Sequence, residues 1–141
     1  MRLSGAVRRT LIRRARRLAR WVGVPIELLV VDDTAMAELN ALHRGEPKPT
    51  DVLSFAPDIA DDLGLVLPGQ IAINWDAVAR QAPRADVWAQ LDEASSLLVH
   101  GAAHLAGHDH HGRGPARAML AFERRLARRL GLTWLPRPYE H

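Results

Sequence analysis

The chain of 141 residues contains no cysteine, so neither a disulfide nor a thiolate zinc finger can belong to its structure. No apolar run approaches the roughly 20 residues that cross a bilayer, which predicts that no membrane is among its partners. A chain without thiols suits the reducing cytoplasm, and we expect a cytoplasmic protein. Its length and its hydrophobic fraction of 48% are typical of one globular domain, expected to comprise residues 1–141.

Acidic residues are missing from the first 26 positions, whereas arginine is abundant there. Leu11, Ala15, Leu18 and Val22 recur every 3–4 residues, which predicts an amphipathic helix with an arginine face. A second basic helix is predicted over about 113–130. Their arginines include Arg8, Arg9, Arg13, Arg14, Arg16, Arg17, Arg20, Arg117, Arg124, Arg125, Arg128 and Arg129. Two such faces suit a polyanion such as RNA, although each alone also fits an ordinary solvated helix face.

Strand and helix patterns alternate along the rest of the chain. The expected strands are 26–31, 51–55 and 69–74, and the expected helices are 5–22, 33–42, 76–83 and about 85–106. Residues 58–67, with Asp61 and Asp62 at the tip, are expected to form a loop. The sequence therefore predicts an α/β fold, a single compact domain with a small mixed sheet flanked by helices.

Histidines are concentrated in one short segment, since five of the seven lie within twelve residues. His100 and His104 are four residues apart, so a helix places both imidazoles on one face. Gly107 lets the chain turn back, because glycine accepts positive φ, and His110 can then return to the same point. This spacing predicts one zinc ion per chain at the C-terminal end of the long helix, with a fourth position open to water.

The same spacing invites comparison with zinc peptidases that carry the signature HExxHxxGxxH. Those enzymes need a glutamate directly after the first histidine as general base, and this chain has Gly101 there. Asp109 is a nearby carboxylate that could act as a base or orient the ligand His110. A zinc peptidase is therefore kept only as an alternative.

Two motifs in the right order carry a resemblance to a known family. The segment His100–His110, H-G-A-A-H-L-A-G-H-D-H, resembles the HGxLHLxGYDH signature of the YbeY endoribonucleases. Pro49–Phe55, P-T-D-V-L-S-F, resembles the family's second motif. Further matches, from about residue 26 onward, are Leu39-Asn40, Arg44-Gly45, Met119 with Glu123, and Leu130-Gly131-Leu132.

The resemblance implies an α/β fold, a metal centre and cleavage of single-stranded RNA. It also implies a role in 16S ribosomal RNA 3′-end processing and in ribosome quality control. The implied partners are ribosomal RNA in the ribosomal subunit and, in addition, a ribosomal protein or a GTPase. A zinc-stabilised protein that binds ribosomal RNA without cutting it is the alternative from another class.

The family's functional positions carry over onto this chain by number. Those that match its metal ligands are His100, His104 and His110. Arg44 matches its functional arginine, and a guanidinium there can bind a phosphate in bidentate fashion and stabilise transition-state charge. Thr50, Asp51 and Ser54 fall in the second motif, where they either line the cleft or fix the turn after Pro49.

The chain departs from the family pattern at three positions. His108 stands where the family usually has tyrosine, and it adds either a rival ligand or a proton-transfer group. Gln70 replaces an aspartate, and Ala103 replaces a leucine. None of these changes removes a metal ligand, so the predicted zinc site is left intact.

Overall fold

The computed structural model describes residues 3–60 and 64–132, which form five helices and five strands. The helices are α1 (Gly5–Val22), α2 (Asp33–Arg44), α3 (Trp75–Gln81), α4 (Val87–Leu105) and α5 (Arg113–Arg129). The strands are β1 (Ile26–Val31), β2 (Val52–Phe55), β3 (Asp58–Ala60), β4 (Leu65–Leu67) and β5 (Gly69–Asn74). None of the described helices is long and apolar enough to cross a membrane.

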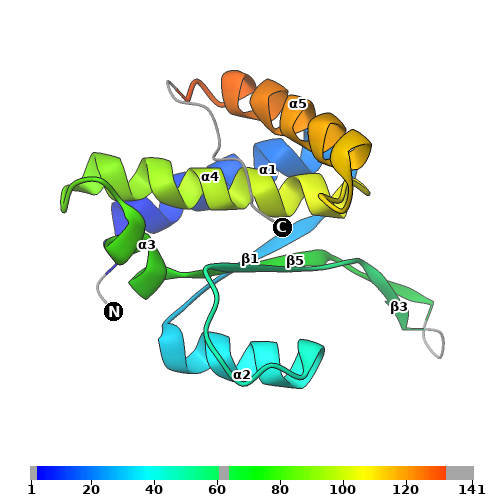
Figure 1. The fold of residues 1–141 in the computed structure, drawn as a ribbon, viewed down its shortest axis with the longest axis horizontal. Coiled ribbons are helices and arrows are strands. Elements are labelled where there is room, and N and C mark those ends of the chain that lie inside the picture. The colour runs from blue at the N-terminus through cyan, green and yellow to red at the C-terminus, as the bar shows by residue number, and fades with distance from the viewer. Residues whose placement is uncertain (1–2, 61–63, 133–141) are drawn as a thin grey trace.

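The sheet that organises the fold has three strands in the order β1-β5-β2. β1 runs parallel to β5, and β2 runs antiparallel to it. Figure 1 shows α2 on one face of this sheet and α1, α4 and α5 on the other. The prediction of a small mixed sheet flanked by helices is confirmed.

The expected loop at 58–67 is instead an antiparallel hairpin, in which β3 pairs with β4. The expectation was wrong because two three-residue strands are too short to show a clear apolar alternation. Gly64, with φ of +64°, supplies the left-handed backbone that the reversal requires. Asp61 and Asp62, expected at the tip, lie outside the described residues.

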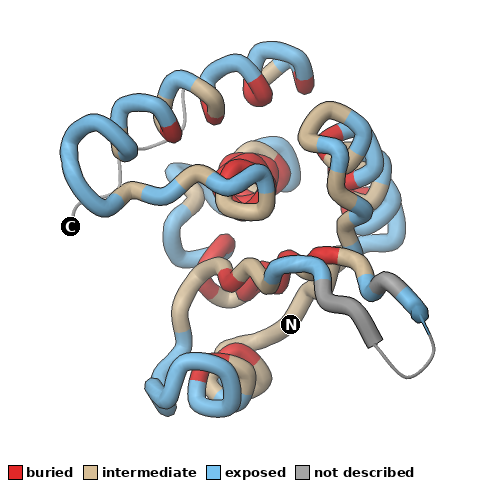
Figure 2. The backbone as a smooth tube through the Cα atoms, turned by 90° about the vertical axis from the view of Figure 1, so that its right-hand side faces the viewer, coloured by how far each residue is buried: buried red, intermediate tan, exposed pale blue. Residues whose placement is uncertain are grey.

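Helix α4 is the central element of the core. It packs against α1 and α5 and against strands β2 and β5, and Figure 2 shows the buried residues gathered around it. Its buried side chains include Leu97, Leu98 and Val99, each 0% exposed, and also the imidazole of His100. A metal-ligating side chain on this helix is therefore held in place by packing from several sides.

Helix α1 has the amphipathic pattern predicted for it. The Ser4 hydroxyl accepts a hydrogen bond from the Val7 backbone N–H at 3.2 Å and caps the helix. Gly23, with φ of +73°, ends it. The side chains that face the core are Val7, Leu11, Ala15 and Leu18. Most of the arginines are therefore left on the outer side, whereas the half-buried Arg14 donates to the hydroxyl of Ser95 on α4.

Candidate metal centre

Three imidazoles meet where α4 ends. His100 and His104 lie one turn apart on α4, and His110 returns from the loop that follows. One ring nitrogen from each of the three lies within 4.8 Å of the others. Gly107, with φ of +96°, makes the reversal possible, since α4 stops at Leu105.

Hydrogen bonds at the Nδ1 atoms set the tautomers of two of these rings. Nδ1 of His104 lies 3.0 Å from the carbonyl oxygen of His108, and Nδ1 of His100 lies 3.0 Å from Oε1 of Glu123. A carbonyl or a carboxylate oxygen only accepts, so each Nδ1 donates and each Nε2 of the neutral ring keeps its lone pair.

The two Nε2 atoms fit a shared metal ion. They lie 3.2 Å apart. A tetrahedral zinc with Zn–N bonds of about 2.0–2.1 Å would separate two ligand nitrogens by about 3.3 Å. Imidazole nitrogens are also ligands that zinc prefers. Imidazole nitrogens that converge in this way are a donor set suited to a metal ion, so the residues present fit the ion.

The pKa of the His104 imidazole is lowered from 6.5 to about 4, and burial is the largest cause. The neighbouring imidazoles of His100 and His110 and the guanidinium of Arg44 contribute to this lowering, and the hydrogen bond to the His108 carbonyl opposes it. At neutral pH the ring is therefore uncharged, which is the form that binds a metal.

We expect the metal-free protein to lose stability as the pH falls from about 6.5 to about 4. The unfolded chain takes up a proton at His104 near pH 6.5, whereas the folded chain does so only near pH 4, so acid favours unfolding throughout this window. Urea unfolding of chelated protein at several pH values measures the effect. The His104→Ala variant should have a flatter profile there, and equal slopes for the two proteins would contradict the assignment.

A cleft of about 420 Å³ opens beside the triad. It is lined by the end of α2, the loop before β2, β2 itself and the three histidines. Arg44 lies in the last turn of α2, and its guanidinium donates to the Ser54 carbonyl oxygen at 3.5 Å. Lys48 is also in the lining, where its ammonium lies 3.9 Å from the carboxylate of Glu46, and Asp51 adds a second carboxylate. The guanidinium of Arg44 is therefore the cation of the lining that is best placed to meet an anionic group near the three imidazoles.

The residues of the second motif line this cleft and are also fixed through their backbone. Asn74, fully buried at the end of β5, donates from Nδ2 to the Thr50 carbonyl at 3.1 Å and from its backbone N–H to the Asp51 carbonyl at 2.9 Å. Nδ2 of Asn40 donates to the Lys48 carbonyl at 2.9 Å. Thr50, Asp51 and Ser54 therefore lie at the cleft on a loop tied to the sheet and to α2.

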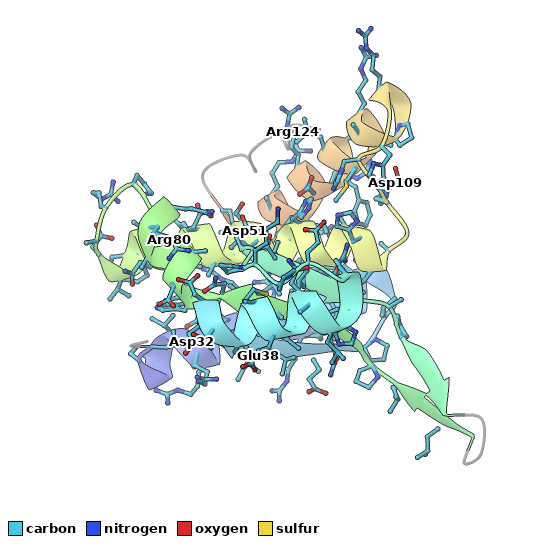
Figure 3. All side chains as sticks on the ribbon, turned by 60° about the horizontal axis from the view of Figure 1, so that its bottom comes forward. Asp32, Glu38, Asp51, Arg80, Asp109 and Arg124 are labelled. Carbon is cyan, nitrogen blue, oxygen red and sulfur yellow. The ribbon has the colours of Figure 1, made fainter. Side chains whose placement is uncertain are left out.

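Asp109 and His108 do not belong to the histidine cluster that could hold a metal ion. Asp109 is exposed, projects outward from the loop after α4 (Figure 3), and accepts from the His111 backbone N–H at 3.0 Å. The ring of His108 lies 4.5 Å from that of Phe122 on α5. Gln70 lies outside the cleft, and its side-chain amide donates to Glu27 on β1 at 3.5 Å.

Glu123 is the carboxylate that contacts one of the predicted metal ligands, His100. It is 2% exposed and holds the imidazole of His100, itself 5% exposed. From the sequence alone, Glu123 was part of a motif match with Met119 and had no predicted role. The available signal was that Glu123 is the one acid of an arginine-rich helix and is spaced four residues from the core residue Met119.

Gly101 has no room for the glutamate that a zinc peptidase needs. A Cβ at this position would lie 2.9 Å from Cγ2 of Ile71 on β5, closer than carbon atoms approach. The helix and the sheet can pack this tightly only because residue 101 lacks a side chain. The close packing of α4 on the sheet therefore argues against the peptidase alternative.

Comparisons with known proteins agree with the motifs. The family model described as endoribonuclease YbeY matches residues 3–131. Endoribonuclease YbeY of Roseiflexus castenholzii is 42% identical over 119 residues, covering 78% of this chain and 72% of the relative. The Paracoccus denitrificans protein of the same name is 38% identical over 147 residues, covering 92% of this chain and 79% of the relative.

A solved structure has the same fold. The solution structure of TM1509 from Thermotoga maritima superposes with a TM-score of 0.56 at 24% identity, covering 92% of this chain and 85% of the other. The match of the family model to nearly the whole described chain, together with relatives near 40% identity, settles the relationship. The chain belongs to the YbeY endoribonuclease family.

Proposed function

We propose that the protein is a zinc-dependent endoribonuclease that cuts single-stranded RNA. The observation that supports this most directly is one cleft whose lining contains both the histidine triad and Arg44. Hydrolysis of a phosphodiester needs an activated nucleophile and cations that neutralise the developing negative charge. The triad and Arg44 line the same cleft, so both can contact one phosphate bound there.

The side chains divide the chemical work among them. His100, His104 and His110 would hold zinc. Zinc held there would lower the pKa of a bound water toward about 7 and would polarise the bond that is attacked. Arg44 binds the scissile phosphate through its planar fork of N–H donors. Glu123 keeps His100 in the tautomer whose Nε2 lone pair faces the triad.

The substrate class is ribosomal RNA. This part of the proposal rests on the resemblance of both motifs to the family, which implies 16S ribosomal RNA 3′-end processing and ribosome quality control. The partners are then the ribosomal subunit and a ribosomal protein or a GTPase bound to it. The protein acts in the cytoplasm, where ribosomes are assembled.

The proposal is tested by incubating the purified protein with a labelled ribosomal RNA fragment and measuring zinc on the same sample. We expect one zinc per chain and cuts in single-stranded segments. Chelation should abolish the cuts, and added zinc should restore them. A duplex of the same sequence is the control and should stay intact. RNA that remains uncut by protein with one zinc per chain would contradict the proposal.

The second candidate function is binding of ribosomal RNA without cleavage. The two arginine-rich helices favour it, because they offer a basic surface independent of the cleft. In the same experiment this function predicts retained RNA, full zinc content and no cuts. The cleavage assay thus separates the two candidates.

A further inference from the structure

Aromatic rings and arginine side chains alternate along a stripe that starts beside the metal centre. His108, two residues before the ligand His110, stacks against Phe122 of α5 with ring centroids 4.5 Å apart. The guanidinium of Arg125 lies 5.6 Å from the centroid of the same Phe122 ring. The start of the stripe is therefore set by the loop that carries the third predicted ligand.

The stripe continues along α5 and crosses to α1 at Trp21. Arg129 follows Arg125 by one helical turn, and its guanidinium lies 5.5 Å from the centroid of the Trp21 ring. Arg17 lies 5.0 Å from the same ring and donates to the carbonyl oxygen of Arg129 at 2.7 Å. We define the aromatic–arginine stripe as His108, Phe122, Arg125, Arg129, Trp21 and Arg17.

The surface around the stripe is positively charged, and neither α1 nor α5 has an exposed acidic residue that would neutralise this charge. α1 contains no acidic residue, and the one acid of α5, Glu123, is buried against His100. Among the described residues, no arginine of α1 or α5 forms an ion pair of 4 Å or less. Arg124, for example, projects outward from α5 in Figure 3. Such a surface attracts a polyanion.

The alternation of aromatic rings with guanidinium groups indicates which class of polyanion this surface would bind. Guanidinium groups bind phosphates, and aromatic faces stack on bases, but only unpaired bases offer their faces to a protein. The half-buried rings of Phe122 and Trp21 pack against the core, and the half-buried ring of His108 lies against Phe122. Their orientation is therefore largely fixed before a ligand arrives.

We propose that the aromatic–arginine stripe binds the single-stranded part of an RNA that extends beyond the cleft. The identity of the polymer rests on the proposed function, whereas the binding itself needs no cleavage. His108 belongs to the loop that carries His110, so an RNA strand bound on the stripe lies beside the loop of the third predicted ligand. An RNA held there can extend from the stripe to the metal centre.

The test compares two double variants of α5 that remove the same charge. Arg125→Gln with Arg129→Gln alters the stripe, whereas Arg117→Gln with Arg128→Gln removes two exposed arginines that make none of the ring contacts. The probe is a fluorescein-labelled, 2′-O-methylated 12-mer of uridine, followed by anisotropy with the zinc-loaded protein. A gel checks that the probe stays intact, and thermal unfolding checks that both variants fold.

We expect the stripe variant to bind the 12-mer about tenfold more weakly and the control variant less than threefold more weakly. The salt dependence of log K should also become shallower by about 1.4 in the stripe variant, since each lost phosphate contact on a single strand removes about 0.7. Equal weakening of both variants, or undiminished binding by the stripe variant, would overturn the proposal. So would equally strong, stripe-dependent binding of a 12-base-pair RNA duplex.

The outcome is distinguishable from failure of the proposed function. A protein that binds the 12-mer through the stripe but cuts no RNA would refute the nuclease function and leave the stripe in place. If both double variants cut RNA at the same rate and bind it with the same affinity, the nuclease function stays in place and the stripe is refuted.

Discussion

Replacement of His104 by alanine is expected to abolish RNA cleavage and to weaken zinc binding by a factor on the order of 10²–10³. Structural zinc sites with four ligands bind with about 10–16 kcal/mol, so one lost ligand removes roughly 3 kcal/mol. His104 lies between the other two rings, with centroids 4.6 Å from His100 and 5.1 Å from His110. Competition with a zinc-binding dye measures the affinity, and a gel assay measures cleavage.

The matched control for this variant is His43→Ala. His43 is an exposed histidine on α2 whose ring packs on Phe55, and it lies outside the triad. Its loss should leave zinc content and cleavage unchanged. A His104→Ala protein that still holds one zinc per chain with the affinity of the unaltered protein would contradict the metal centre.

Replacement of Arg44 by glutamine is expected to lower kcat for RNA cleavage about 10²–10³-fold while zinc content stays at one per chain. This is the effect of removing one donor that stabilises transition-state charge. Arg44 is exposed, and its guanidinium makes only a long hydrogen bond to the Ser54 carbonyl among the described residues, so its loss should hardly alter the unfolding midpoint. Single-turnover kinetics with saturating enzyme give the rate of the chemical step.

Two further variants serve as comparisons for Arg44→Gln. Arg44→Lys keeps the charge but not the planar fork, so it should recover only part of the rate. Arg80→Gln, which breaks a surface ion pair with Asp33, is the control for losing an arginine elsewhere and should cut RNA normally. If Arg44→Gln cuts at the full rate and merely binds RNA a few fold more weakly, the catalytic role of Arg44 is lost.

Much of the metal centre could be predicted from the sequence because its spacing is local. The four-residue step from His100 to His104 fixes two ligands on one helix face, and Gly107 marks the turn that returns His110. Glu123 could not be assigned in this way. Its contact with His100 spans 23 positions and depends on how α5 packs on α4, which no local pattern encodes.

The relation between the two basic helices likewise needed three-dimensional information. Periodicity identifies an arginine face on α1 and another on α5. The pattern is the same whether the two faces form one surface of the protein or two separate surfaces. The contact between Arg17 and the carbonyl of Arg129, and their shared ring of Trp21, place the two faces together. The short strands β3 and β4 escaped prediction for the opposite reason, since their local signal is weak.

The burial of α4 separates metal loading from folding. In a zinc finger the ion supplies the stability of the domain, and the chain unfolds without it. Here the helix that presents His100 and His104 is already fixed by contacts with α1, α5 and the sheet. We therefore expect a folded apoprotein that gains and loses its ion reversibly. The fraction of active molecules in a cell would then follow the supply of free metal rather than the rate of protein synthesis.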